Sequence, residues 1–70
     1  MIETGSKLLL SARDAAKLLG CGERTLHKYN AAGTIPAPVR LGRRWVWRRL
    51  ELIAWTRAGC PPRARWSWGK

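Results

Sequence analysis

Acidic residues are scarce in this 70-residue chain, where four Asp and Glu face fourteen Lys and Arg and leave a net charge of +10 at neutral pH. A charge of this size attracts polyanions and repels most basic partners. A chain this short builds one small core, and a catalytic pocket needs more rigid scaffold than such a core offers. We therefore expect no enzyme and no cofactor, but a binding module whose partner is an anionic polymer or surface.

Cysteine, histidine and long apolar runs are also scarce. Cys21 and Cys60 lie far apart and His27 is the single histidine, whereas a structural zinc site needs four closely spaced ligands. We expect no metal site and interpret both cysteines as reduced thiols. The longest apolar run near the start, at positions 8–10, is far shorter than the ~20 residues of a membrane span, and no secretory signal is recognisable. These features predict a cytoplasmic location.

Apolar residues nonetheless make up 46% of the chain and include five tryptophans, which is enough for a compact core. Residues 1–7 are polar and are interpreted as a flexible start. Ser11 followed by Asp14 is a helix-start pattern, in which the hydroxyl and the carboxylate can each satisfy a free backbone amide. This pattern predicts a helix over 12–19, which Gly20 ends.

A second helix is expected over 23–32, with Gly33 ending it. Helical spacing predicts that Leu26 and Tyr29 face the core, so that the opposite face is basic and polar. Two helices joined by a short turn form a helix-turn-helix unit, whose second helix can reach base edges in a major groove. The candidate DNA contacts on this helix are Arg24, Thr25, His27 and Lys28.

Residues 39–47 contain two short β-favouring runs around a Gly-Arg-Arg segment and predict a hairpin. A two-residue loop would pair Val39 with Val46 and turn both tryptophans outward, whereas a three-residue loop would pair Val39 with Trp47. We prefer the three-residue loop because it buries two indoles. Val46 then faces outward, and residues 42–44 form the tip.

Five arginines occur between positions 40 and 49 with no acid among them. Arginine binds phosphates in fork geometry and enters narrow minor grooves, so the hairpin is interpreted as a DNA-binding wing. Arg48 and Arg49 have three interpretations that stay open: they cap the next helix, pair with Glu51, or lie along phosphates. The candidate wing contacts are Arg40, Arg43 and Arg44, and the candidate phosphate contacts elsewhere are Arg13, Arg48 and Arg49.

A third helix is expected over 49–57, with Leu52 and Trp55 on its core face. A second side of this helix is also apolar, and two explanations stay open. In the first, the apolar side of this helix joins neighbouring copies of the chain. In the second, the basic tail at 58–70 folds back and its tryptophans cover the apolar side. We expect this tail to be irregular or flexible. The residues that concern this self-association hypothesis are Leu50, Ile53, Trp66 and Trp68.

The motifs follow one another in a specific order along positions 8–57. They are Leu9-Leu10-Ser11, Ala15-Ala16-Lys17-Leu18-Leu19-Gly20, Arg24-Thr25-Leu26-His27-Lys28, Gly33-Thr34-Ile35-Pro36-Ala37-Pro38-Val39-Arg40-Leu41-Gly42 and Leu52-Ile53-Ala54-Trp55. This order resembles the AlpA-like and excisionase-type winged helix-turn-helix proteins of the MerR-like group. The resemblance implies a mainly helical domain with a small β-hairpin, whose second helix enters a major groove and whose wing meets the adjacent minor groove.

The same resemblance implies a bacterial or phage-encoded protein that works on the nucleoid. Members of the family act as recombination directionality factors for tyrosine or serine integrases, as transcriptional regulators, or as both, and they bind double-stranded DNA as head-to-tail copies. Gly22 departs from the family pattern, because a serine cap is usual there. Two other function classes stay open from the residues alone: an Arg/Trp-rich membrane-active peptide and an RNA-binding protein.

Overall fold

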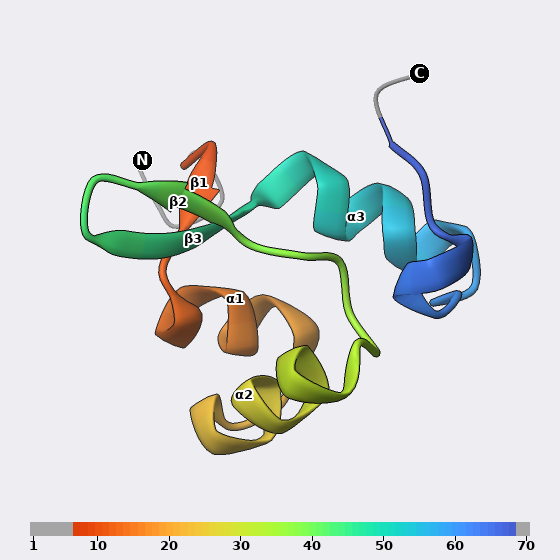
Figure 1. Ribbon diagram of the computed structural model, residues 1–70, viewed down its shortest axis with the longest axis horizontal. Coiled ribbons are helices and arrows are strands. Elements are labelled where there is room, and N and C mark those ends of the chain that lie inside the picture. The colour runs from red at the N-terminus through yellow and green to blue at the C-terminus, as the bar shows by residue number, and fades with distance from the viewer. Residues whose placement is uncertain (1–6, 69–70) are drawn as a thin grey trace.

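The computed structural model describes residues 7–68, which form three α-helices, a three-stranded antiparallel sheet and a short 3-10 turn (Figure 1). None of the helices in this part of the chain is long and apolar enough to cross a bilayer. This is a winged helix-turn-helix, as the sequence predicts. In chain order the elements are β1 (Leu9–Leu10), α1 (Ala12–Leu19), α2 (Glu23–Ala32), β2 (Val39–Leu41), β3 (Arg44–Arg48), α3 (Arg49–Arg57) and η2 (Arg63–Arg65).

Helices α1 and α2 have the predicted bounds because their end signals are local. The Ser11 hydroxyl accepts the Asp14 backbone N–H, with 3.2 Å between Oγ and N, and so caps α1. The carboxylate half of the expected capping pattern is absent, because Asp14 pairs with Lys7 instead. Gly20 and Gly33 end the two helices in the left-handed conformation, with φ of +80° and +74°, a region that glycine enters without steric cost.

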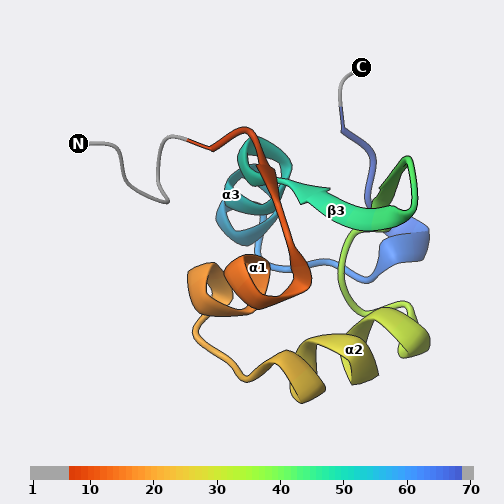
Figure 2. The ribbon, with the colours of Figure 1, turned by 90° about the vertical axis from the view of Figure 1, so that its left-hand side faces the viewer.

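The core lies between α1, the inner face of the sheet and α3, and α2 packs on the other side of α1 (Figures 1 and 2). Its largest fully buried member is Trp47, which is 2% exposed and donates its indole N–H to the Pro36 carbonyl over 3.1 Å. Cys21 packs against this core as a small, partly buried residue. The large aliphatic side chains that are fully buried are Leu10, Leu26, Ile35 and Leu52.

Tyr29 corrects the sequence analysis, which placed it in the core. Its side chain is 43% exposed and borders a surface hollow beside Thr34 and Trp55. Helix α2 forms the outer layer of the fold and has α1 as its main packing partner, so only the narrow stripe around Leu26 is buried.

The hairpin has a two-residue loop, so the predicted three-residue register is wrong. Val39 lies opposite Val46 and Leu41 lies opposite Arg44, which places Arg44 in β3 rather than at the tip. Gly42 has φ of +65°, and a positive φ at the first of two turn residues is what a type II′ loop requires. Turn chemistry therefore decides the register, rather than the burial of two indoles.

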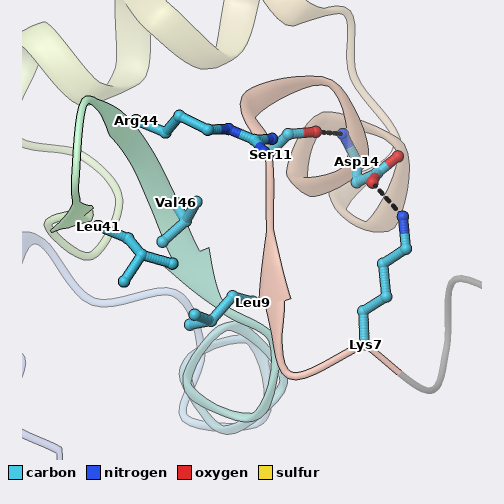
Figure 3. A pocket seen from close by; sticks show the side chains of 7 residues that line it. All are labelled: Lys7, Leu9, Ser11, Asp14, Leu41, Arg44 and Val46. Atoms are coloured by element: carbon cyan, nitrogen blue, oxygen red, sulfur yellow. Dashed lines mark hydrogen bonds and ion pairs between the residues drawn. The ribbon is translucent and has the colours of Figure 1, made fainter.

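Strand β1 was not predicted, and it makes β3 the central strand of the sheet, with Leu10 opposite Trp47. Neighbouring side chains on a strand point to opposite faces, so Trp47 enters the core while Val46 lies on the other face. Figure 3 shows Val46 there together with Leu9 and Leu41. Val46 is buried, and the prediction that it faces solvent is wrong because β1 on one side and β2 on the other flank β3.

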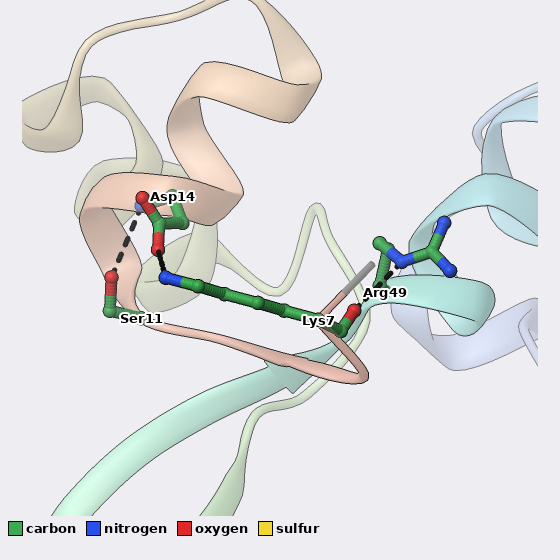
Figure 4. A network of polar contacts seen from close by, with 4 residues as sticks. All are labelled: Lys7, Ser11, Asp14 and Arg49. Carbon is green, nitrogen blue, oxygen red and sulfur yellow. Dashed lines mark hydrogen bonds and ion pairs between the residues drawn. The ribbon is translucent and has the colours of Figure 1, made fainter. Parts of the chain in front are cut away.

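Lys7 ties the start of β1 to two helices (Figure 4). Its ammonium lies 3.2 Å from Asp14 Oδ2, and its carbonyl accepts the Arg49 Nε–H over 2.7 Å. The sequence predicts a flexible start at residues 1–7, and Lys7 instead has these two contacts; the rest of that segment, residues 1–6, lies outside the described residues.

The tail after α3 contains the three-residue turn η2 and, over its other described residues, no helix or strand. Trp55 donates its indole N–H to the Pro61 carbonyl over 2.8 Å, and the Arg63 N–H bonds to the Gly33 carbonyl over 3.0 Å. Trp66 packs against the core and donates to Glu51. These contacts join elements that are distant in sequence, so local patterns could not reveal them.

Candidate nucleic-acid interface

Helix α2 presents a basic face on the side turned away from α1. Leu26 faces α1 and is fully buried, whereas Arg24, His27 and Lys28 are exposed and Thr25 is half-buried at the margin. The arrangement agrees with the helical spacing that the sequence analysis used. His27 also has a local partner, since its Nε2 lies 3.7 Å from Glu23 Oε2 one turn earlier.

A cleft of about 480 Å³ separates α2 from the hairpin. Helix α2 contributes His27 and Asn30 to its wall, the wing contributes Trp45, and the tail contributes Arg63. Three segments that are far apart in sequence therefore meet around one concave surface. Glu23, at the start of α2, is the acidic residue among those that line the cleft.

Trp45 is exposed on the wing, although the predicted three-residue loop would bury its indole. It shares the inner face of the sheet with Trp47, but it extends past the core, and 55% of it is exposed. Arg40 lies opposite it on β2, with its guanidinium carbon 5.6 Å from the ring centroid. Arg40 also donates to the Gly42 carbonyl over 3.1 Å, so the cation is held beside the indole at the base of the turn.

The three wing arginines do not lie on one face. Arg43 occupies the turn and Arg40 the inner face, whereas Arg44 lies opposite Leu41 on the outer face (Figure 3). All three are exposed. The hairpin therefore presents cations at its tip and on both faces, and Arg40 is the one on the face that carries Trp45.

The two arginines at the start of α3 have partners within the chain. Arg48 Nη1 lies 3.3 Å from Glu51 Oε1, one of the interpretations left open by the sequence. Its guanidinium also lies 5.9 Å from the centre of the Trp68 ring. Arg49 is half-buried and donates to Lys7. Arg13, on α1, is exposed.

An apolar patch lies on the other face of the sheet from Trp45. It surrounds a hollow of about 210 Å³ and consists of Leu8, Leu9, Leu50 and Trp68, with Arg48 at its edge. Leu50 is 50% exposed and Trp68 is 39% exposed, so the tail returns to this side of α3 without covering it. Ile53 is half-buried, and the Trp66 indole N–H donates a hydrogen bond to Glu51.

Two features now coincide: a helix-turn-helix with an exposed basic second helix, and a wing whose inner face lies across a cleft from that helix. They define a winged helix-turn-helix DNA-binding protein. In agreement, a sequence-family model described as a helix-turn-helix domain matches residues 9–60, and the chain belongs to this family of sequence-specific DNA-binding domains. No curated protein and no solved structure matches the chain.

Proposed function

We propose that this protein is an excisionase-type recombination directionality factor. It binds repeated sites in duplex DNA, bends the DNA, and promotes the excision of a mobile element by a tyrosine or serine integrase. It promotes excision by binding DNA, without catalysis or a cofactor. It acts on the nucleoid in the cytoplasm of a bacterium. A second role in controlling transcription follows from the same binding, because a protein that occupies DNA near a promoter changes the rate of transcription from that promoter.

The cleft between α2 and the wing is the observation that supports this proposal. Adjacent major and minor grooves are separated by one sugar-phosphate backbone, so a protein that enters both must leave space for that backbone. In the proposed complex, Arg24, Thr25, His27 and Lys28 contact the major groove. The wing residues Arg40, Arg43 and Arg44 contact the minor groove and its phosphates, and Arg13 contacts phosphate, while Arg48 and Arg49 act mainly within the protein.

Self-association on DNA is the second part of the proposal. The apolar patch includes Leu50 and Trp68 and lies on the other face of the sheet from Trp45, so a neighbouring copy bound there leaves α2 and the inner face of the wing free. A contact between unlike surfaces whose rotation does not close into a ring adds copies in an open array, and in the proposed complex this array follows the duplex. Ile53 extends this patch along α3. Trp66 supports it indirectly, by holding the tail against Glu51.

A selection experiment tests the proposal. Duplexes selected from a random pool by the purified protein are expected to share a motif, and footprinting across the DNA beside its own gene is expected to show that motif repeated. Addition of the protein to an integrase encoded nearby is then expected to raise excision and lower integration. Arg24→Ala and Arg43→Ala, in α2 and in the wing, are expected to weaken both effects.

The experiment also separates the alternatives. Excision that is unchanged, together with a change in a promoter-reporter signal, would favour an AlpA-like transcriptional regulator, which uses the same DNA-binding residues. Leakage of anionic vesicles by a peptide of residues 61–70 would favour the membrane-active alternative. The structure offers less support for that peptide, since Arg63 and Trp66 are bonded within the domain. Preferential binding of RNA over duplex DNA would contradict the whole proposal.

A further inference from the structure

Arg63 lies beyond the matched helix-turn-helix region and is held against the end of α2 by neutral groups. Its Nη2 donates to Asn30 Oδ1 over 2.7 Å and to the Asn30 carbonyl over 3.2 Å. Its Nε donates to the Ile35 carbonyl over 2.9 Å. The Nη1 group of Arg63 takes part in none of the hydrogen bonds among residues 7–68. A guanidinium cannot lose its proton in a protein, so Arg63 brings a full positive charge to the wall of the cleft.

No carboxylate within residues 7–68 forms an ion pair with Arg63, since the ion pairs found there join other residues. Glu23 lines the same cleft, but it precedes Asn30 by seven positions on α2, which is about 10 Å along a helix axis. The charge of Arg63 is therefore uncompensated at its own end of the cleft. A half-buried charge in this state interacts more strongly with an approaching anion than an exposed charge does.

Asn30 supplies a second donor at the same point. Arg63 can only donate, so the Asn30 oxygen must face it, and the Asn30 amide nitrogen is left as a donor. Trp45 lines the same cleft with an exposed apolar face. Two donors for an anion and one flat apolar surface match the alternating phosphate and deoxyribose units of a DNA strand.

We propose that Arg63 and Asn30 form a binding site for one backbone phosphate of duplex DNA, and that the Trp45 indole packs on the adjacent deoxyribose. The inference rests on the proposed function, in which the strand between the two grooves passes through this cleft. The tail thereby gives the DNA interface a contact that lies outside the matched domain. This contact holds one DNA backbone between α2 and the wing, and so sets the register of both elements on the duplex.

Single methylphosphonate substitutions, each of which removes the charge of one phosphate, test the site directly. On the duplex selected above, one such substitution between the two contacted grooves is expected to weaken wild-type binding by about tenfold, the scale of one charged hydrogen bond. Arg63→Gln is expected to weaken binding to the unmodified duplex by a similar factor and to be insensitive to that substitution. Arg57→Gln is the matched control: it removes one exposed cation from α3 outside the cleft, and it should keep the sensitivity.

Asn30→Asp separates phosphate binding from a merely structural role of Arg63. An Asp at this position pairs with Arg63 and strengthens its anchorage, so the melting temperature is expected to stay or rise. The same carboxylate neutralises the cation and repels phosphate, so DNA binding is expected to fall by tenfold or more and to lose the sensitivity to the one methylphosphonate. Opposite effects on stability and on affinity are not expected if Arg63 only holds the tail.

The outcomes distinguish this site from the proposed function. A wild-type protein that selects no duplex overturns both. A protein that selects a duplex through Arg24 and Arg43 but shows the same methylphosphonate profile as Arg63→Gln and Asn30→Asp overturns the phosphate site alone. If Arg63→Gln does not fold, the wild-type scan and Asn30→Asp still decide, because a scan without a sensitive position between the grooves contradicts the site.

Discussion

Trp66 donates its indole N–H to Glu51, with 3.0 Å between Nε1 and Oε2, and so connects the tail to a buried carboxylate on α3. Glu51 is 7% exposed, and its other oxygen accepts from Arg48 over 3.3 Å. A buried acid is stable only when donors surround it, and here one of the two donors comes from the tail. The tail is therefore part of the folded domain.

Replacement of Glu51 tests this role in stability. Glu51→Ala leaves the Trp66 N–H without its acceptor and is expected to lower the free energy of unfolding by about 1–3 kcal/mol. Urea unfolding followed by tryptophan fluorescence measures the change. Glu23→Ala is the control, because Glu23 is exposed, and it should change stability by less than about 0.5 kcal/mol. Equal effects of the two variants would contradict the assigned role of Glu51.

The two tryptophans on the inner face of β3 are expected to differ in what they support. Trp47→Ala removes the largest fully buried side chain and should cost about 3–5 kcal/mol of stability. Trp45→Ala removes an exposed ring and should cost much less, but it should weaken DNA binding several-fold. Thermal unfolding and fluorescence-anisotropy titration of both variants measure the two quantities. Weak DNA binding by Trp47→Ala under conditions where it is folded would argue against this division.

Two glycines at the ends of the helix-turn-helix turn should respond oppositely to substitution. Gly20 has φ of +80°, so Gly20→Ala places a side chain in the left-handed region and is expected to lower stability by about 1 kcal/mol. Gly22 caps α2 with φ of −82° and without a side-chain hydrogen bond. Gly22→Ser is expected to raise stability by about 0.3 kcal/mol through the new cap. Both sites have open space for a Cβ atom, so crowding does not complicate the comparison.

Self-association through the apolar patch predicts an effect of Leu50→Asp on cooperativity. The variant should bind a single site with the wild-type affinity, and its cooperative binding to repeated sites should fall about tenfold. Sedimentation velocity with one-site and three-site duplexes measures both. Leu18→Asp is the control, because Leu18 is a similarly exposed leucine on α1 outside the patch. Unchanged cooperative assembly of Leu50→Asp would exclude the patch.

Salt dependence measures how many phosphates the basic surface neutralises. If about 6 phosphates are neutralised, the logarithm of the binding constant should fall with the logarithm of salt concentration with a slope of about −5. Arg43→Ala, at the wing turn, should reduce the steepness by about 1. A series of titrations from low to physiological salt gives the slope. A wild-type affinity that does not depend on salt would be inconsistent with phosphate binding.

The sequence predicts well those elements whose ends are determined by residues only a few positions away. The Ser11 hydroxyl, Gly20 and Gly33 act within a few residues of the helix ends that they determine, and the α1, α2 and α3 bounds are all as expected. The errors have non-local causes. The burial of Val46 depends on β1, which lies more than thirty positions away, and the exposure of Tyr29 depends on the outer position of α2.

The sequence by itself determined the helix-turn-helix, the basic face of α2 and the DNA-binding class, because helical periodicity and capping act over short distances. Its scarcity of acids also determined that the surface attracts polyanions. Only the tertiary structure decided where the cations act: Arg49 donates to the Lys7 carbonyl, Arg44 lies on the outer face of the wing, and Arg63 returns from the tail to the cleft. The reason is physical, because a charge acts through the groups within a few ångströms of it, and chain folding rather than sequence order brings those groups together.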